Sequence, residues 1–214
     1  PGCVERRERY FASLARLGTC EFDGRLSLAR LGGTLLLFAR ANPATHGQRF
    51  VQVATSADEG ASWSAFSLIS LAGYAYPQGD LYFFSVQPNP ADDGSLLALF
   101  PLAHKFAGCI GMAVSEDGLR WSPVTPLLRC AVHGERTVHH PVAGILKRGD
   151  AAHLYIHHNV PGVTADVAPS AKAQAEHRYL KLPRTRLMRY SIPLAALRAW
   201  TAESMRELAA QPRE

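Results

Sequence analysis

The sequence predicts an all-β protein made of repeated antiparallel sheets and followed by one C-terminal helix. A turn motif occurs twice, as SADEGASW in residues 56–63 and, in a shorter form, as SEDGLRW in residues 115–121. Short apolar runs alternate with turn residues between positions 26 and 192, and the 14 prolines and 17 glycines fit a chain with many turns. Both observations favour repeated hairpins over a mixed α/β fold.

The repeated motif has the chemistry of a tight turn that is held by a carboxylate. Asp58 and Asp117 are expected to accept backbone N–H bonds across the turn, glycine permits a positive φ, and Trp63 and Trp121 cover apolar sheet surface. These four residues are therefore expected to be structural. We expect each turn on the outer rim, between the third and fourth strands of its sheet, with both tryptophans mostly buried and in equivalent positions.

Three repeating units follow from this pattern, near residues 23–70, 80–128 and 139–192. Each has a strand–turn–strand rhythm, and the apolar run 81–86 predicts one inner strand that is buried on both faces. The third unit lacks the turn motif. Units of this size predict a β-propeller with about three visible blades, and since closed propellers have about four blades or more, residues 1–192 are expected to form an incomplete ring or a fragment.

Residues 193–214 change to a helical pattern. Apolar residues recur at helical spacing, and Pro193 fits the first helical position. The recurring residues are Leu194, Leu197, Trp200, Met205 and Leu208. A helix packed on the propeller rim is the prediction, with a partly frayed tail as the alternative.

Composition excludes several classes of function. The chain is 47% hydrophobic and 19% charged, with a formal net charge of +5 that is spread over many segments. Aromatic and basic residues are not interleaved, so nucleic-acid binding is not expected. No apolar stretch is long enough to span a membrane and no signal peptide is visible, which predicts a soluble chain of unknown compartment.

The four cysteines do not have the spacing of a structural metal site. Cys3, Cys20, Cys109 and Cys130 contain no C-x-x-C pair, and their disulfide state is left open. Cys109 lies in an apolar strand, where a buried free thiol is the commoner arrangement. No metal and no cofactor are expected.

The turn motif resembles the Asp-box of sialidases and related β-propellers, also called the BNR repeat. Residues 21–42 resemble the opening blade of two groups of glycoside hydrolases. In the five-bladed furanosidase-like enzymes an Asp opens this strand as nucleophile or base, and the resemblance places that role on Asp23. In sialidases an Arg at this strand clamps the substrate carboxylate, and the resemblance places that role on Arg25.

The innermost strands of a propeller begin near one central funnel, so residues at those starts should converge although they are distant in sequence. The expected catalytic carboxylates are Asp23, Asp80 and Glu135. The expected substrate-binding residues are Arg25, Arg40, Asn42, Arg136, His139, His140 and His157. On their strand, His153 and His157 are expected to face one side and His158 the other, and either His157 or His158 is expected to line the funnel with His139 and His140. The structural alternatives are a turn Asp at position 23, a surface arginine at position 25 and solvated loop residues at positions 80 and 135.

These residues predict a glycoside hydrolase-like propeller that acts on a glycan or glycoconjugate. The carboxylate set is incomplete, because residues 41–47 supply no acid/base where sialidases carry one. The alternatives are therefore a non-catalytic carbohydrate-binding or scaffold propeller, or a partial enzyme. Three blades leave unpaired strand edges, so self-association through these edges is also expected.

Overall fold

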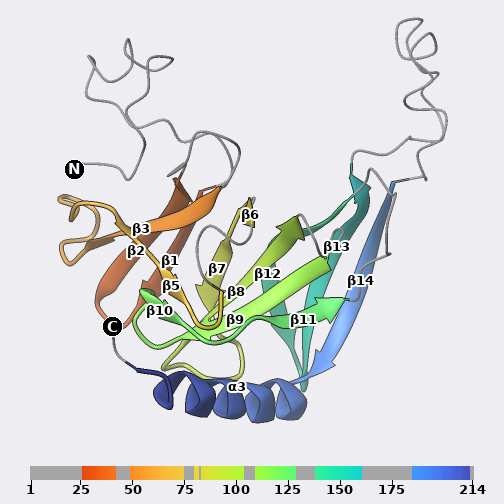
Figure 1. Ribbon diagram of the computed structural model, residues 1–214. Helices are drawn as coiled ribbons and strands as arrows, with labels where there is room; N and C mark the ends of the chain where they lie inside the picture. The colour runs from red at the N-terminus through yellow and green to blue at the C-terminus, as the bar shows by residue number, and fades with distance from the viewer. Residues whose placement is uncertain are drawn as a thin grey trace, which may run out of the picture.

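Three antiparallel sheets stand next to one another above a single helix in the computed structural model (Figure 1). The structure describes residues 26–41, 49–74, 80–81, 83–103, 109–128, 138–160 and 185–212. The prediction of an all-β fold with a C-terminal helix is confirmed. Within the described ranges, no helix combines the length and the apolar character that crossing a bilayer requires.

The first sheet has four strands in the order in which they occur along the chain. The strands are β1 (Ser27–Leu31), β2 (Thr34–Ala41), β3 (Phe50–Ser56) and β4 (Ser67–Leu68). β1 and β2 form a hairpin whose turn contains Gly32 with φ +56°, a conformation that favours glycine. This consecutive antiparallel order is that of one propeller blade.

The second sheet repeats this order, but its inner strand is divided. It contains β6 (Asp80–Leu81), β7 (Ser85–Pro88), β8 (Leu96–Ala103), β9 (Cys109–Ser115) and β11 (Thr125–Leu128), and both β6 and β7 pair with β8. The prediction of one continuous strand over residues 81–86 was wrong. The two phenylalanines between the short strands, at positions 83 and 84, are buried outside the ladder, so apolar contacts replace strand pairing there.

The third sheet consists of three long strands, β12 (Val138–Arg148), β13 (Ala151–Val160) and β14 (Arg186–Pro193). The β12–β13 register shifts twice, so β12 is irregular along its length. A two-residue parallel ladder between β5 (Ser70–Leu71) and β10 (Arg120–Trp121) connects the outer parts of the first and second sheets.

Helix α3 (Leu194–Ala209) runs across the end of the second and third sheets that carries the hairpin turns (Figure 1). Pro193 is the residue before its first turn rather than the first helical residue, one position from the prediction. The Trp200 indole Nε1 donates to Thr125 Oγ1 at 3.0 Å, and the Asn89 amide donates to Thr201 Oγ1 at 3.0 Å in a buried setting. These bonds fix the helix to the second sheet.

The inner strands β1, β7 and β12 lie side by side, and hydrogen bonds connect them across the sheets. The Ser27 hydroxyl on β1 donates to the Val86 carbonyl at 2.9 Å and accepts from the Val86 N–H at 2.8 Å. The Gln87 amide on β7 donates to the Ile145 carbonyl at 3.1 Å, and its oxygen accepts from the Ile145 N–H. Neighbouring inner strands around a shared axis are the arrangement of a β-propeller.

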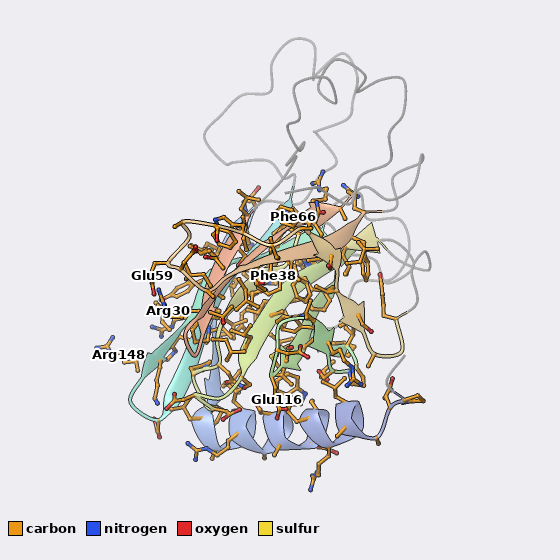
Figure 2. The ribbon with its side chains drawn as sticks, turned by 90° about the vertical axis from the view of Figure 1, so that its left-hand side faces the viewer. Arg30, Phe38, Glu59, Phe66, Glu116 and Arg148 are labelled. Atoms are coloured by element: carbon orange, nitrogen blue, oxygen red, sulfur yellow. The ribbon has the colours of Figure 1, made fainter. Side chains whose placement is uncertain are left out.

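Two apolar seams hold the three sheets together. Between the first and second sheets, the Trp121 ring lies edge-on to Phe38 and Phe84, with centroid distances of 5.8 Å and 4.8 Å. Figure 2 shows Phe38 in the interior of the molecule. The second seam joins the second and third sheets with α3, and its fully buried members include Leu97, Leu154, Ile156 and Leu197.

The two turn motifs have the hydrogen bonds that their sequence predicts. In the first Asp turn (residues 56–63), Asp58 Oδ1 accepts from the Ser62 N–H and from the Ser56 hydroxyl, both at 2.8 Å. In the second Asp turn (residues 115–121), Asp117 Oδ1 accepts from the N–H groups at positions 119 and 120 at 2.7 Å and 2.8 Å. Each turn follows the third strand of its sheet and precedes the fourth, as expected.

The two tryptophans occupy equivalent positions but differ in burial. The Trp63 indole N–H donates to the Gly60 carbonyl at 3.1 Å, and that of Trp121 donates to the Gly118 carbonyl at 3.0 Å. Trp121 is fully buried, whereas Trp63 is only partly buried. The first sheet covers Trp121, and this explains the difference from the expectation that both would be mostly buried.

A comparison of two glycine substitutions tests the packing between the first and second sheets. Gly60→Ala should destabilise the protein by about 1–2 kcal/mol, because φ is +88° there and the nearest atom to an added Cβ is 3.6 Å away. Gly118→Ala carries the same backbone penalty at φ +76°, and its Cβ would also overlap the buried Leu36 side chain, which adds about 1–3 kcal/mol. Urea unfolding of both variants measures the difference. Equal losses would contradict the packing described for this seam.

The first Asp turn predicts a pH dependence of stability. The Ser62 hydroxyl and N–H, followed by the Ser56 hydroxyl, lower the pKa of Asp58 to about 2. A lowered folded-state pKa contributes stability that is present above about pH 4 and is lost as the pH falls through about 2. The urea midpoint of Asp58→Ala should therefore lie below that of the wild type at pH 6 and approach it near pH 2. A difference that is constant over this range would exclude the carboxylate as its source.

Candidate functional site

The candidate site lies at the end of the molecule where the inner strands begin (Figure 1). β12 starts there with Val138, and β13 ends there with Val160. The opposite end carries the hairpin turns and α3. Because β1, β7 and β12 are neighbours, residues at or just before their starts meet around one axis.

Half of the site residues predicted from the sequence lie outside the described ranges. These residues are Asp23, Arg25, Asn42, Glu135 and Arg136. Asp80 is the first residue of β6, and its backbone pairs with that of Ala103. Its side chain is not among the described side chains. The distances between the three predicted carboxylates are therefore not part of the described structure.

Two of the predicted histidines, His139 and His140, lie on β12, and their side chains are partly buried. The His139 ring lies 4.2 Å from the ring of His158 on β13, centroid to centroid, at an interplanar angle of 48°. The His140 ring meets Phe83 edge-on at 5.3 Å. Phe83 stands just before β7, so this contact joins the inner strands of the second and third sheets.

Tyr190 on β14 contacts His158, the histidine that lies next to His139. Its hydroxyl lies 2.8 Å from His158 Nε2, and the two rings are stacked with centroids 5.8 Å apart. Burial lowers the pKa of His158, and the nearby charges of His139, Arg186 and His157 lower it further. His158 is therefore neutral near pH 7, which suits Nε2 to accept the hydrogen bond that the Tyr190 hydroxyl donates.

Two other predicted site residues, His157 and Arg40, lie on a different face or strand from the His158–Tyr190 pair. His157 pairs with His140 in register, on the face of β13 opposite to His158, because successive side chains of a strand alternate. Arg40 is buried near the end of β2, where its carbonyl accepts a hydrogen bond of 2.8 Å from the Gln52 amide. The structure thus places His139 with the His158–Tyr190 pair on one face of the third sheet and His140 with His157 on the other face. Arg40 lies apart from both groups, on β2.

The sequence did not predict Phe83 and Tyr190 as members of these groups, and for β13 it left open whether His157 or His158 lines the funnel. His158 was expected on the opposite face of its strand from His153 and His157, which the alternation along β13 confirms. Tyr190 follows a long segment without a periodic pattern, so no sequence signal fixed its register against β13. The signal available for Phe83 was its place at the start of an inner strand.

Two groups of side chains therefore lie at this end of the third sheet. His139, His158 and Tyr190 combine imidazoles and a phenol on one face, and His140 meets the Phe83 ring on the other. Such groups donate and accept hydrogen bonds with hydroxyl groups and offer apolar edges, and a carbohydrate presents both kinds of surface. Among the described residues, no group of three His, Cys, Asp or Glu side chains is placed to hold a metal ion.

Comparisons with known proteins give structural likeness only. No protein-family model matches the sequence. No curated protein matches it either. Similar solved structures include a Hadza microbial sialidase, with 13% identity and a TM-score of 0.48 over 64% of this chain and 32% of that one.

Two further structures are similar over more of the chain. The Bombyx mori GH32 beta-fructofuranosidase has 14% identity and a TM-score of 0.46, covering 80% of this chain and 34% of that one. The Cellvibrio cellulosa alpha-L-arabinanase has 16% identity and a TM-score of 0.48, covering 88% of this chain and 60% of that one.

This chain spans about a third of the length of the sialidase and of the fructofuranosidase. With TM-scores of 0.48 or less, the assignment of the fold rests on the three sheets, the two Asp turns and the inner-strand hydrogen bonds of the chain itself.

Titration of His158 tests the geometry of the cluster. Tyr190→Phe removes a donor to the neutral ring, so the pKa of His158, which lies below its ordinary 6.5, should rise in this variant. Because the unfolded chain takes up this proton first, His158 should also reduce stability as the pH falls through about 6.5. Histidine ring NMR over a pH series measures the shift. The ring resonances of His153, which bonds to Ser191, serve as the internal control.

Proposed function

We propose that the chain forms part of a glycan-acting propeller of the glycoside hydrolase type. In this proposal Asp23 acts as nucleophile or base, and Arg25 clamps the substrate. The observation that carries the proposal is the hydrogen-bonded contact between the inner strands, from Ser27 on β1 to Val86 and from Gln87 on β7 to Ile145 on β12.

This contact limits how far apart the proposed residues can be. Asp23 stands four residues before Ser27, and an extended chain of that length spans at most about 14 Å. Glu135 stands three residues before Val138, which corresponds to at most about 10 Å. These limits support the proposal that both carboxylates lie near the same axis as the described His139 and His140, with Asp80 at the strand start between them.

Glycoside cleavage uses two carboxyl groups, one as general acid and one as nucleophile or base. Asp23 supplies one of them in this proposal, and Asp80 or Glu135 supplies the other. A separation of about 5 Å between the two groups would give retention of configuration, and a separation of about 6.5–9.5 Å would give inversion.

The remaining proposed residues bind the sugar. A guanidinium group can hold a carboxylate or two hydroxyl groups with a pair of parallel hydrogen bonds. Imidazoles bind hydroxyl groups as donor or acceptor. The proposed substrate contacts are Arg25, Arg40, Asn42, Arg136, His139, His140 and His157. The proposal gives the two motif turns, which resemble Asp-boxes, no part in binding, because each follows the end of the third strand of its sheet, away from the starts of the inner strands.

The test is a screen with aryl glycosides that includes a sialoside and a furanoside. Asp23→Asn should lower kcat on the order of 10³-fold or more and leave the Tm nearly unchanged, because the carboxylate acts in the transition state. Asp93→Asn is the matched control, since Asp93 is exposed in the turn between β7 and β8. Asp80→Asn and Glu135→Gln then identify the second carboxyl group.

The outcomes separate the proposal from its alternative. Hydrolysis that survives Asp23→Asn would exclude the proposed mechanism. Glycan binding without turnover by the wild-type chain would instead identify a carbohydrate-binding propeller, and the His139–His158–Tyr190 cluster would then be the first place to substitute.

A further inference from the structure

The first and second sheets are structural repeats, and their register permits a comparison position by position. Ala54 and Ala113 each stand two residues before the serine of an Asp turn. Ala54 pairs with Leu37 on β2, and Ala113 pairs with Ala98 on β8. Leu37 and Ala98 therefore occupy equivalent positions in the two sheets.

The comparison extends to the inner strands. Leu28 pairs with Leu37, and Val86 pairs with Ala98. Leu28 in the first sheet therefore corresponds to Val86 in the second. Two residues earlier on the same face, Leu26 corresponds to Phe84. The residues between these positions support this register, because Ser27 and Ser85 are both serine.

Burial at these equivalent positions is opposite in the two sheets. In the second sheet, Phe84 and Val86 are 3% and 5% exposed. In the first sheet, Leu26 and Leu28 are 47% and 60% exposed, and Trp63 is only partly buried although its equivalent Trp121 is fully buried. Farther out on the same face, Ala39 and Ala54 are buried with Phe66, and Trp63 packs against this cluster. The first sheet thus has the same apolar face as the second, but its inner-strand part is uncovered.

The seam between the two sheets shows what such a face accepts. The second sheet is covered by the side of β2 that carries Leu36 and Phe38. Alternation along β2 places these residues on the opposite side from Leu37. The uncovered face, defined by Leu26, Leu28 and Trp63, is therefore shaped for the equivalent side of another sheet.

In the third sheet, the face that corresponds to the Leu36–Phe38 side of β2 is not covered by another described sheet. Tyr155 is the fifth residue of β13, as Phe38 is the fifth residue of β2. Its side chain lies on the face of β13 opposite to Leu154, which is buried in the second seam. On the same side, Leu146 and Leu187 are 60% and 64% exposed. This open face contains the large exposed leucines of β12 and β14.

The charges of the two open faces are complementary. Arg148 and Arg189 are exposed on the open side of the third sheet, where they pair in register with Ala151 and Tyr155. Figure 2 shows Arg148 extending into solvent. At the first sheet, the exposed first Asp turn contributes Asp58 and Glu59. Glu59 bonds to Arg30 on the same surface, so the net negative charge there comes from Asp58, whose carboxylate also accepts the hydrogen bonds of its turn.

We propose that a second copy of this chain covers the uncovered face, with the third sheet of each copy packed on the first sheet of the other. Such a contact is head-to-tail, and in two copies it closes on itself. Two copies of three sheets would form a ring of six, which lies within the range of about four to eight blades found in propellers. This inference does not depend on the proposed hydrolysis.

Light scattering after size-exclusion chromatography of the 214-residue chain tests the proposal. The wild type should be a dimer at micromolar concentration. Leu28→Glu and Leu187→Glu should each raise the dimer Kd by about 10-fold or more, because each places a charge in one face of the contact. Leu119→Glu is the matched control, since Leu119 is exposed in the second Asp turn and belongs to neither face. Circular dichroism confirms that each variant is folded.

A mixing experiment identifies the geometry. When Leu28→Glu is mixed with Leu187→Glu, one contact carries both substitutions and the other carries none, so the mixture should form more dimer than either variant alone. A symmetric contact through two first sheets would make Leu187→Glu silent, and this result would overturn the head-to-tail arrangement. A wild type that stays monomeric at about 100 micromolar would overturn the proposal as a whole.

Discussion

The burial of Trp121 between two sheets is the contact on which the rest of this architecture depends. Its ring touches Phe38 of the first sheet and Phe84 of the second, and its indole N–H is satisfied by the Gly118 carbonyl of its own turn. A large aromatic residue can be fully buried only if this polar group has a partner. The turn therefore supplies the hydrogen bond that permits the seam, and the seam sets the distance between β1 and β7.

The sequence predicted those parts of the fold that are determined by local chemistry. The Asp turns were predictable because carboxylate, glycine and tryptophan lie within eight residues, and the helix because its apolar residues recur at helical spacing. The division of the inner strand at Phe83 and Phe84 was not predictable. An apolar run has the same pattern whether its side chains pair in a ladder or fill the space between two sheets.

The candidate site was predicted less completely, for a related reason. The starts of the inner strands were correctly expected to be neighbours, and this placed His139 and His140 close to the axis. The partners of these histidines come from other strands. Which ring meets His139 depends on the register of β12 and β13, where a shift of one residue would bring His157 to that position instead. Whether Tyr190 reaches His158 depends on the register of β13 and β14, whose connection spans residues 161–185.

The side-chain amide of Gln87 has a mechanical consequence. It both donates to and accepts from the backbone of Ile145, so it reproduces between two sheets the paired bonds that normally join two strands of one sheet. A side chain that imitates a backbone in this way resists sliding of the second sheet along the third. These two bonds therefore fix the position of β7 along β12 at Ile145.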